Sequence, residues 1–143
     1  MKREKFPVVV HLFLFNKKNL LLLKRRNTGY EDEHYGVVAG HLEENENVYN
    51  AIIREAKEEV GINILLDDLK IVQVMHFKDA NEERIDYFFL CRKWEGDIKN
   101  MELKKCSELN WYPIDDLPDN TIECVKFAIN NYIQKINFTL FGW

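Results

Sequence analysis

The stretch from Gly40 to Ile62 places the strongest constraint on this chain, because it brings three carboxylates to one side of a predicted helix. Glu55, Glu58 and Glu59 stand at helical offsets, and at roughly 100° per residue they share one face. Neighbouring like charges destabilise a helix, so stability alone would not favour this pattern. Oxygen ligands of this kind suit hard cations such as Mg²⁺ or Mn²⁺. An ordinary solvated helix face is the alternative, since Glu and Lys are good helix formers.

The residues around these carboxylates resemble the box that defines the Nudix family. All fixed positions of that box are present at their spacing: Gly40, Glu46, Arg54, Glu55, Glu58, Glu59 and Gly61, with aliphatic residues at Ala56 and Ile62. The resemblance implies an α/β fold, a Nudix-type α/β/α sandwich with a mixed central sheet, the box helix and a C-terminal helix. It also implies hydrolysis of a nucleoside diphosphate linked to another group, with divalent metal held on the box helix.

By the same resemblance, the box residues acquire expected roles. Glu55, Glu58 and Glu59 are the expected metal ligands, and one of them is the candidate for the base that activates water. Arg54 is expected to orient a neighbouring carboxylate. Glu46 is expected to hold the loop before the helix by hydrogen bonds.

The resemblance also assigns residues at the ends of the box and in a later loop. The backbone carbonyl of Ala39 is a further expected metal ligand, and Gly40 and Gly61 permit tight backbone at the two ends of the box. The run after Trp94 resembles the MutT-type loop that adds one more carboxylate, which here is Glu102. The alternatives in that loop are Glu95 and Asp97. An exposed loop glutamate without a ligand role is the other interpretation of Glu102.

Candidate substrate-binding residues lie outside the box. Arg25 and Arg26 follow a predicted strand, where the family often places a basic residue against phosphate, and an arginine offers a bidentate fork. Tyr30 lies in a polar loop and could stack on a base, although a surface tyrosine is the simpler interpretation. Asn120 and Asp119 stand where MutT-like proteins read the base, and helix capping alone would also explain both.

We expect one domain over residues 1–143, because this length suffices for one core. The box helix is predicted from Val48 to about Val60, with Asn47 as N-cap and Gly61 as its stop. A final helix, capped by residues 119–121, is predicted to end near Lys135. β-Branched and aromatic runs predict strands at 7–15, 20–25, 36–39, 69–77, 84–94 and 109–113.

Composition narrows the partners and the compartment. The net charge of −4 argues against a general nucleic-acid binder. The three cysteines are widely spaced and form no CxxC, which favours reduced structural thiols. No apolar stretch is long enough to span a membrane, so the cytoplasm is the expected location. The aromatic tail, residues 138–143, is expected to pack either on the domain or on a second subunit, which leaves a homodimer open.

Within the family, the markers favour a small-molecule nucleotide, specifically a nucleoside or deoxynucleoside triphosphate cleaved to monophosphate and pyrophosphate. The ADP-ribose branch tends to carry a proline where this chain has Phe77, and the dinucleoside-polyphosphate branch a tyrosine where Asp79 stands. The run from Trp94 to Pro118 resembles triphosphate diphosphatases that cleanse nucleotide pools. A diphosphatase acting on ADP-ribose or a nucleotide sugar, and a non-catalytic nucleotide sensor, remain as alternatives.

Overall fold

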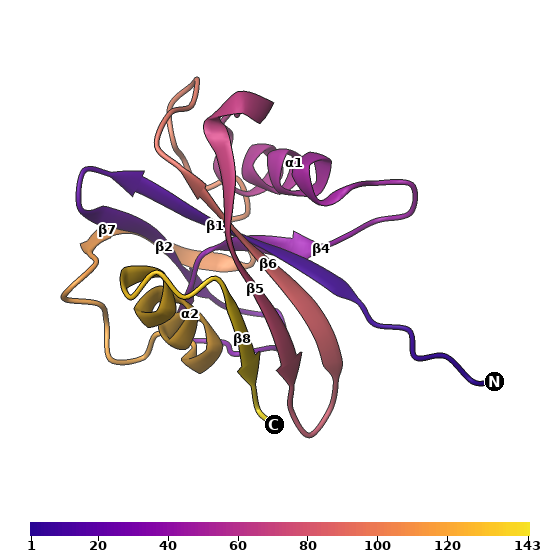
Figure 1. The fold of residues 1–143 in the computed structure, drawn as a ribbon. Coiled ribbons are helices and arrows are strands. Elements are labelled where there is room, and N and C mark those ends of the chain that lie inside the picture. The colour runs from indigo at the N-terminus through magenta and orange to yellow at the C-terminus, as the bar shows by residue number, and fades with distance from the viewer.

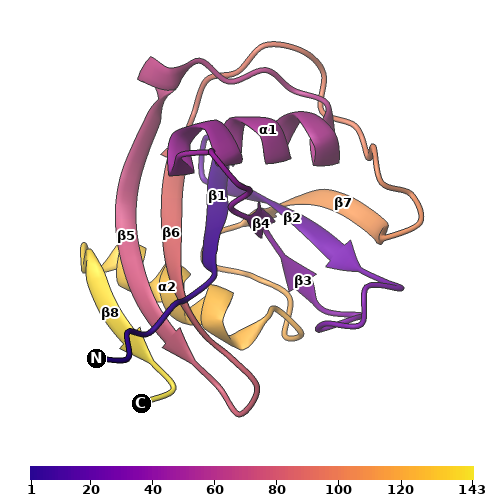
Figure 2. The ribbon, with the colours of Figure 1, turned by 90° about the vertical axis from the view of Figure 1, so that its right-hand side faces the viewer.

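Two helices cover opposite faces of a mixed β-sheet in the computed structural model, which describes residues 1–143. Helix α1 (Val48–Val60) lies on one face and helix α2 (Glu123–Ile133) on the other (Figure 1, Figure 2). This α/β/α arrangement confirms the fold class expected from the sequence. Neither helix combines the length and the apolar character that crossing a membrane requires.

Eight strands form the sheet, in the order β3-β2-β1-β6-β5-β8, with β4 paired to β1 and β7 paired to β2. The β1–β6 and β5–β8 pairs are parallel and the others antiparallel, so the sheet is mixed. A short 3₁₀ turn (Leu66–Asp68) precedes β5. The strands are β1 (Val8–Asn16), β2 (Asn19–Arg25), β3 (Tyr35–Gly36), β4 (Val38–His41), β5 (Leu69–Lys78), β6 (Glu83–Cys91), β7 (Cys106–Pro113) and β8 (Phe138–Phe141).

Strands β1 and β2 form a hairpin that opens soon after its turn. They pair only at Phe15 with Leu20 and at Asn16 with Asn19. Beyond these pairs β1 turns to β4 and β6, while β2 turns to β3 and β7. The hairpin therefore divides the sheet into two diverging halves.

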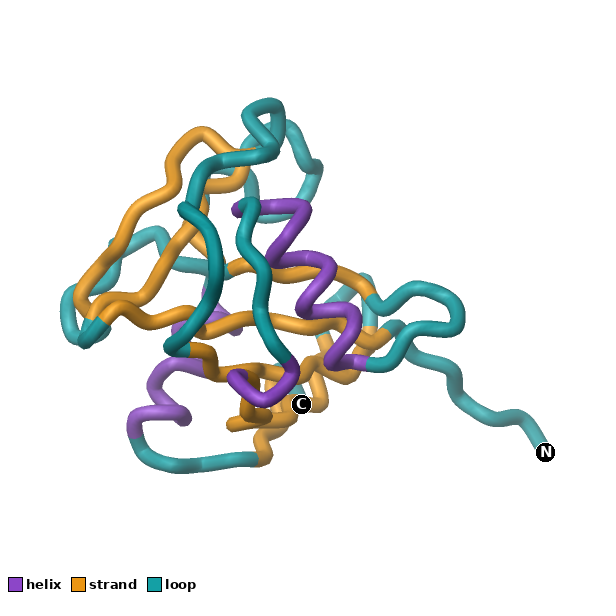
Figure 3. The backbone as a smooth tube through the Cα atoms, turned by 90° about the horizontal axis from the view of Figure 1, so that it is seen from above, coloured by secondary structure: helices purple, strands orange, loops and turns teal.

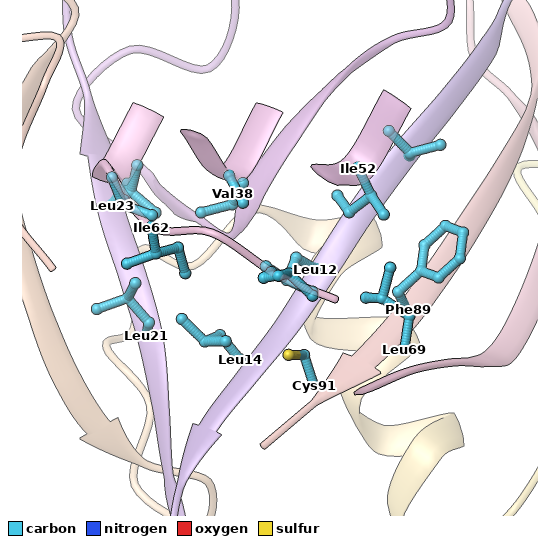
Figure 4. Packing of buried hydrophobic residues seen from close by; sticks show 14 of the residues in the cluster. Leu12, Leu14, Leu21, Leu23, Val38, Ile52, Ile62, Leu69, Phe89 and Cys91 are labelled. Carbon is cyan, nitrogen blue, oxygen red and sulfur yellow. The ribbon is translucent and has the colours of Figure 1, made fainter. Parts of the chain in front are cut away.

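Alternate side chains of β1 enter two separate hydrophobic cores. Leu12 and Leu14 belong to the core beneath α1, where Ile52 of the helix also packs (Figure 4). Phe13 and Phe15 belong to the core against α2. Burying a large apolar side chain contributes roughly 1.5–3 kcal/mol, so both faces of β1 stabilise the fold.

Helix α1 has the limits and caps that its sequence predicts. The side chain of Asn47 accepts a hydrogen bond from the Asn50 N–H at 2.9 Å, which satisfies one free donor of the first turn. Gly61 ends the helix in the left-handed region, with φ of 74°. Seen from above, α1 lies across the strands (Figure 3). Its buried residues are Ala51, Ile52, Ala56 and Val60.

The predicted cap of the last helix is wrong. Helix α2 starts at Glu123 after Ile122, which makes no capping hydrogen bond through its side chain. It ends at Ile133, close to the predicted end near Lys135. Two side chains of the predicted cap donate to backbone carbonyls in loops instead. Asn120 Nδ2 donates to the carbonyl of Glu33 at 2.7 Å, and Thr121 Oγ1 donates to the carbonyl of Pro118 at 2.7 Å.

The aromatic tail packs on the domain itself. Its residues 138–141 form β8, which pairs in parallel with β5 at the edge of the sheet. Phe141 stacks on Phe77 with ring centres 5.5 Å apart, and the Trp143 indole N–H donates to the carbonyl of His76 at 3.1 Å. Of the two expectations for the tail, the structure therefore shows the intramolecular one.

Candidate active site

A cavity of about 730 Å³ lies where β1, β2 and β4 diverge. Helix α1 and the loop after β6 line it with acidic side chains, and the end of β2 lines it with basic ones. Residues on the α2 side complete the lining with a mostly apolar surface: Val9, Val37, Ile122, Cys124 and Val125. The cavity thus joins charged and apolar walls.

Six carboxylates line this cavity, and four of them are expected metal ligands: Glu55, Glu58, Glu59 and Glu102, beside Glu43 and Glu82. Glu59 keeps some contact with solvent, but the Glu59 carboxylate lies among protein atoms, and Glu59 Oε2 accepts a hydrogen bond from the Ala39 N–H at 3.2 Å. Desolvation is the largest cause that raises the pKa of Glu59, followed by the hydrogen bond with Glu55 and the charges of Glu55 and Glu102. These carboxylates therefore repel one another in the absence of a cation.

Arg54 ties the box together through its guanidinium group. It forms a bidentate pair with Glu46, with Nε and Nη2 at 2.7 and 2.9 Å from the two carboxylate oxygens. The hydrogen bond from Arg54 lowers the pKa of Glu46, against an opposing effect of burial. Arg54 Nη1 also donates to Glu55 at 2.7 Å and to Glu58 at 3.3 Å, while Nη2 reaches the carbonyl of His41 at 3.2 Å.

Gly40 leaves the space that the Glu55 carboxylate occupies. A Cβ atom at this position would overlap the Glu55 carboxyl group. Gly61, at the other end of the box, has the positive φ that L-residues rarely adopt. Both glycines therefore meet the steric demands that the box spacing implies.

The predicted basic residues separate into one that lines the cavity and one that does not. Arg25 lines the cavity together with Lys24 and Lys105, whereas Arg26 donates to a backbone carbonyl of the loop after β6 and is absent from the lining. Arg25 Nε donates to the carbonyl of Tyr30 at 2.8 Å, and the guanidinium lies 5.4 Å from the centre of the Tyr30 ring. Tyr30 also lines the cavity.

The structure does not bring the two predicted base-reading residues to the cavity. The side-chain amide of Asn120 donates a hydrogen bond to the Glu33 carbonyl, and Asp119 is exposed. The cavity lining from this segment begins at Ile122 instead. Asn120 stands at a chain position that resembles a base-reading one, but a backbone carbonyl of the protein already takes its side-chain amide.

A chain of buried polar side chains at the cavity was not predicted from the sequence. Asp86 is fully buried between two partners: His11 Nε2 lies 3.0 Å from Oδ2, and Arg84 Nε donates to Oδ1 at 2.8 Å. Burial raises the pKa of Asp86, but the hydrogen bond and charge of His11 and the charge of Arg84 outweigh burial and lower it overall. One signal was available in the sequence, because His11 and Asp86 each interrupt an apolar strand pattern.

Comparison with known proteins identifies the family of the chain. The NUDIX domain model matches residues 5–129. The chain belongs to the Nudix hydrolase family. Its box is therefore a true Nudix box, and its fold is the Nudix fold.

Individual Nudix relatives are distant. An 8-oxo-dGTP diphosphatase of Buchnera aphidicola is 28% identical, and the match covers 94% of this chain and 98% of that protein. Nudix hydrolase 5 of Arabidopsis thaliana is 29% identical over 73% of this chain, which spans only 35% of that longer protein. The crystal structure of a MutT Nudix hydrolase from Burkholderia pseudomallei aligns with a TM-score of 0.82 and 25% identity, covering 89% of this chain and 98% of the other.

The Nudix box of this chain has the right atoms for a divalent cation, but their present positions serve other partners. No three acidic, histidine or cysteine side chains converge closely enough to hold a metal. Glu55 is turned to Arg54, and Glu59 is turned to the Ala39 N–H. All donors are oxygen atoms, which suits Mg²⁺ or Mn²⁺, and the mutual repulsion of these carboxylates favours a cation. The residues therefore fit the metal that the family generally requires.

Proposed function

We propose that this chain hydrolyses a nucleoside or deoxynucleoside triphosphate to a nucleoside monophosphate and pyrophosphate. The observation that carries the proposal is the cavity, whose lining combines six carboxylates and five lysine or arginine side chains with an apolar wall. A triphosphate needs cationic contacts and a nucleoside needs apolar walls, and this cavity offers both. Similarity over nearly the full length to an 8-oxo-dGTP diphosphatase supports the same reaction class.

In this proposal Glu55, Glu58, Glu59, the Ala39 carbonyl and Glu102 would hold Mg²⁺ or Mn²⁺. A bound ion would neutralise phosphate charge and lower the pKa of a water molecule. The chain's own residues then move the proton: a box carboxylate accepts it from the attacking water. The water oxygen bonds to phosphorus, the phosphoanhydride P–O bond breaks, and pyrophosphate leaves.

Positively charged side chains bind the polyphosphate in the same proposal. Arg25, Lys24 and Lys105 line the cavity near the acidic wall. Arg25 is already fixed by its hydrogen bond to Tyr30, so little side-chain entropy is lost when it contacts phosphate. Arg54 keeps two box carboxylates in place and has no contact role with substrate.

Product identification tests the reaction. The purified protein is incubated with Mg²⁺ and a panel of canonical and 8-oxo nucleoside triphosphates, ADP-ribose, nucleotide sugars and dinucleoside polyphosphates. Monophosphate plus pyrophosphate from a triphosphate is the expected result. Turnover of ADP-ribose or a nucleotide sugar alone would refute the proposed substrate, and tight binding without turnover of any compound would favour a sensor.

Neutral isosteres test the assigned carboxylates. Glu58→Gln and Glu59→Gln are each expected to lower kcat at least about 100-fold, equivalent to about 3 kcal/mol of barrier, because each removes a negative ligand. Lys57→Gln is the matched control, since its side chain is exposed and its one hydrogen bond goes to Asn63, which follows the end of the helix. Near-normal kcat in both glutamate variants would contradict the assignment.

A further inference from the structure

The loop between β6 and β7 brings one of its carboxylates to the cavity. Of the acidic residues in this loop, Glu95, Asp97 and Glu102, only Glu102 lines the cavity. The charge of Glu102 is one of the causes that raise the pKa of Glu59, so the two carboxylates lie near each other. Glu102 takes part in none of the ion pairs within the protein. The loop therefore presents a carboxylate that no basic side chain of the protein neutralises by direct pairing.

The first half of this loop docks on the C-terminal end of α1. The last carbonyl groups of an α-helix have no partner within the helix. In α1, the Glu59 carbonyl accepts a hydrogen bond from the Met101 N–H at 3.1 Å, and the Val60 carbonyl accepts one from the Lys99 N–H at 3.1 Å. Figure 2 shows the loop passing this end of the helix. Because Glu59 is itself an expected metal ligand, these bonds place the loop backbone relative to the box.

The second half of the loop is tied to the end of β2. The Arg26 N–H donates to the Lys105 carbonyl at 2.9 Å, and the Arg26 guanidinium donates to the Leu103 carbonyl. These contacts follow Glu102 in the chain, whereas the contacts to α1 precede it. Glu102 thus lies between two stretches of loop that are each held by hydrogen bonds.

Asn100 joins the two sides of the turn around Glu102 through one side chain. Its Oδ1 accepts a hydrogen bond from the Glu102 N–H at 3.0 Å, and its Nδ2 donates to the Cys106 carbonyl at 2.7 Å. The Glu102 carbonyl accepts from the N–H groups of Lys105 and Cys106, both at 2.9 Å. Both backbone polar groups of Glu102 are therefore fixed, and its side chain alone is left to adjust to a ligand.

We propose that Asn100 is a positioning residue for the divalent cation, because its two hydrogen bonds hold the turn that presents the Glu102 carboxylate to the box. The inference rests on the proposed function, which makes Glu102 a metal ligand. It adds a residue that lies outside the cavity lining and acts only through Glu102. Partners that orient a metal ligand typically change metal affinity by roughly 10–100-fold when they are substituted.

Mn²⁺ binding to the intact protein, without nucleotide, tests this role. Free Mn²⁺ is measured by electron paramagnetic resonance during titration. Asn100→Ala is expected to raise the Kd of Mn²⁺ at least about tenfold, because the Glu102 N–H loses the partner that fixes it. Glu102→Gln is expected to raise the Kd by at least as much, because it removes the ligand charge itself. An unchanged Kd in either variant would overturn the proposal.

The double variant separates positioning from a general effect on the fold. If Asn100 acts through Glu102, then Asn100→Ala has no ligand left to misplace once Glu102→Gln is present. The Kd of the double variant is therefore expected to match that of Glu102→Gln within about twofold, instead of showing the product of the two losses. A further tenfold loss in the double variant would refute the role, because Asn100 would then act on the box independently of Glu102.

Asn110→Ala is the matched control. Asn110 is exposed on β7, lies outside the cavity lining and makes no hydrogen bond through its side chain, so the same substitution there should leave the Kd of Mn²⁺ unchanged. If Asn100→Ala does not fold, Asn100→Ser takes its place, since a serine oxygen can still accept from the N–H two residues on. Asn100→Ser is expected to raise the Kd severalfold with Glu102 present and not at all with Glu102→Gln; any other pattern would contradict the role.

The two proposals fail in different ways. If no triphosphate is hydrolysed but Asn100→Ala weakens Mn²⁺ binding only when Glu102 is present, the reaction is wrong and the positioning role stands. If triphosphates are hydrolysed while Asn100→Ala leaves the Kd of Mn²⁺ unchanged, the reaction stands and the positioning role is wrong.

Discussion

Glu59→Gln should make the metal-free protein more stable while abolishing its activity. The Glu59 carboxylate lies beside Glu55 and Glu102, and desolvation together with these charges raises its pKa. Gln has the same shape, carries no charge and still accepts the hydrogen bond from the Ala39 N–H. Removing a repulsive, partly desolvated charge at a functional site commonly stabilises a fold.

The expected gain is modest because Glu59 keeps partial contact with solvent. Stabilising substitutions at functional sites commonly yield about 0.5–2 kcal/mol, and screening by water reduces what is realised, so we expect about 1 kcal/mol at pH 7 with a chelator. At about 2.1 cal/mol/K per residue, a chain of this length unfolds with an entropy near 0.3 kcal/mol/K. The melting temperature should therefore rise by about 3 °C.

The gain has a defined pH dependence. A free glutamate has a pKa of roughly 4.3, and the folded pKa of Glu59 is higher, so the native state binds the proton more tightly. Wild-type stability therefore falls as pH rises from about 4.3 through the folded pKa. The advantage of the variant should be absent at pH 4 and complete above the folded pKa. Added Mg²⁺ should reverse the order, because only the wild type keeps the full set of ligands.

Thermal melts in EDTA at pH 4 and pH 7, repeated with Mg²⁺, measure these differences. Glu58→Gln is the matched control: the Glu58 side chain is exposed and pairs with Arg54, so this variant should lose about 0.3–0.5 kcal/mol. A Glu59→Gln protein no more stable than wild type at pH 7, or equally favoured at pH 4, would refute the reasoning.

Further outcomes follow from the box and the tail. Gly40→Ala should lower kcat/KM at least about tenfold with an intact circular dichroism spectrum, because the new methyl displaces the Glu55 carboxylate. Glu46→Gln should lower the free energy of unfolding in urea by about 1–2 kcal/mol, since it weakens the bidentate pair with Arg54; no loss would argue against a structural role for that pair. Phe141→Ala should lower the melting temperature by several degrees at unchanged kcat, because the ring stacks on Phe77 and meets Phe127 edge-on; a change in kcat would link the tail to the site.

The box helix could be predicted closely because its signals are local. Asn47 supplies the capping oxygen, Gly61 supplies the left-handed stop, and the acidic face adjoins an apolar seam within the same segment. The structure places Glu55, Glu58 and Glu59 on one cavity wall, as their spacing suggested. These features depend on helical geometry alone, which the sequence carries directly.

The remaining parts of the site depend on contacts between distant residues. Asn120 had a plausible role in a cap and in reading a base, but the Glu33 carbonyl, 87 residues away in the chain, takes its amide. His11 and Asp86 are 75 residues apart, and nothing near either one in the sequence announces their pairing. Strand β8 reaches its partner through parallel pairing of Phe138 with Val74. Local propensity cannot rank such pairings, because tertiary context decides them.

The position of β1 has a consequence for folding kinetics. One edge of β1 pairs with β4 soon after in the chain, but its other edge pairs in parallel with β6, so that Val8 meets Ile85. A contact between residues so far apart raises the contact order and slows folding, since the loop entropy is lost before the pairing forms. During synthesis, the edge of β1 that pairs with β6 therefore stays unpaired until β6 has been made. Because β1 is almost entirely apolar, this unpaired edge makes the nascent chain prone to aggregation during that interval.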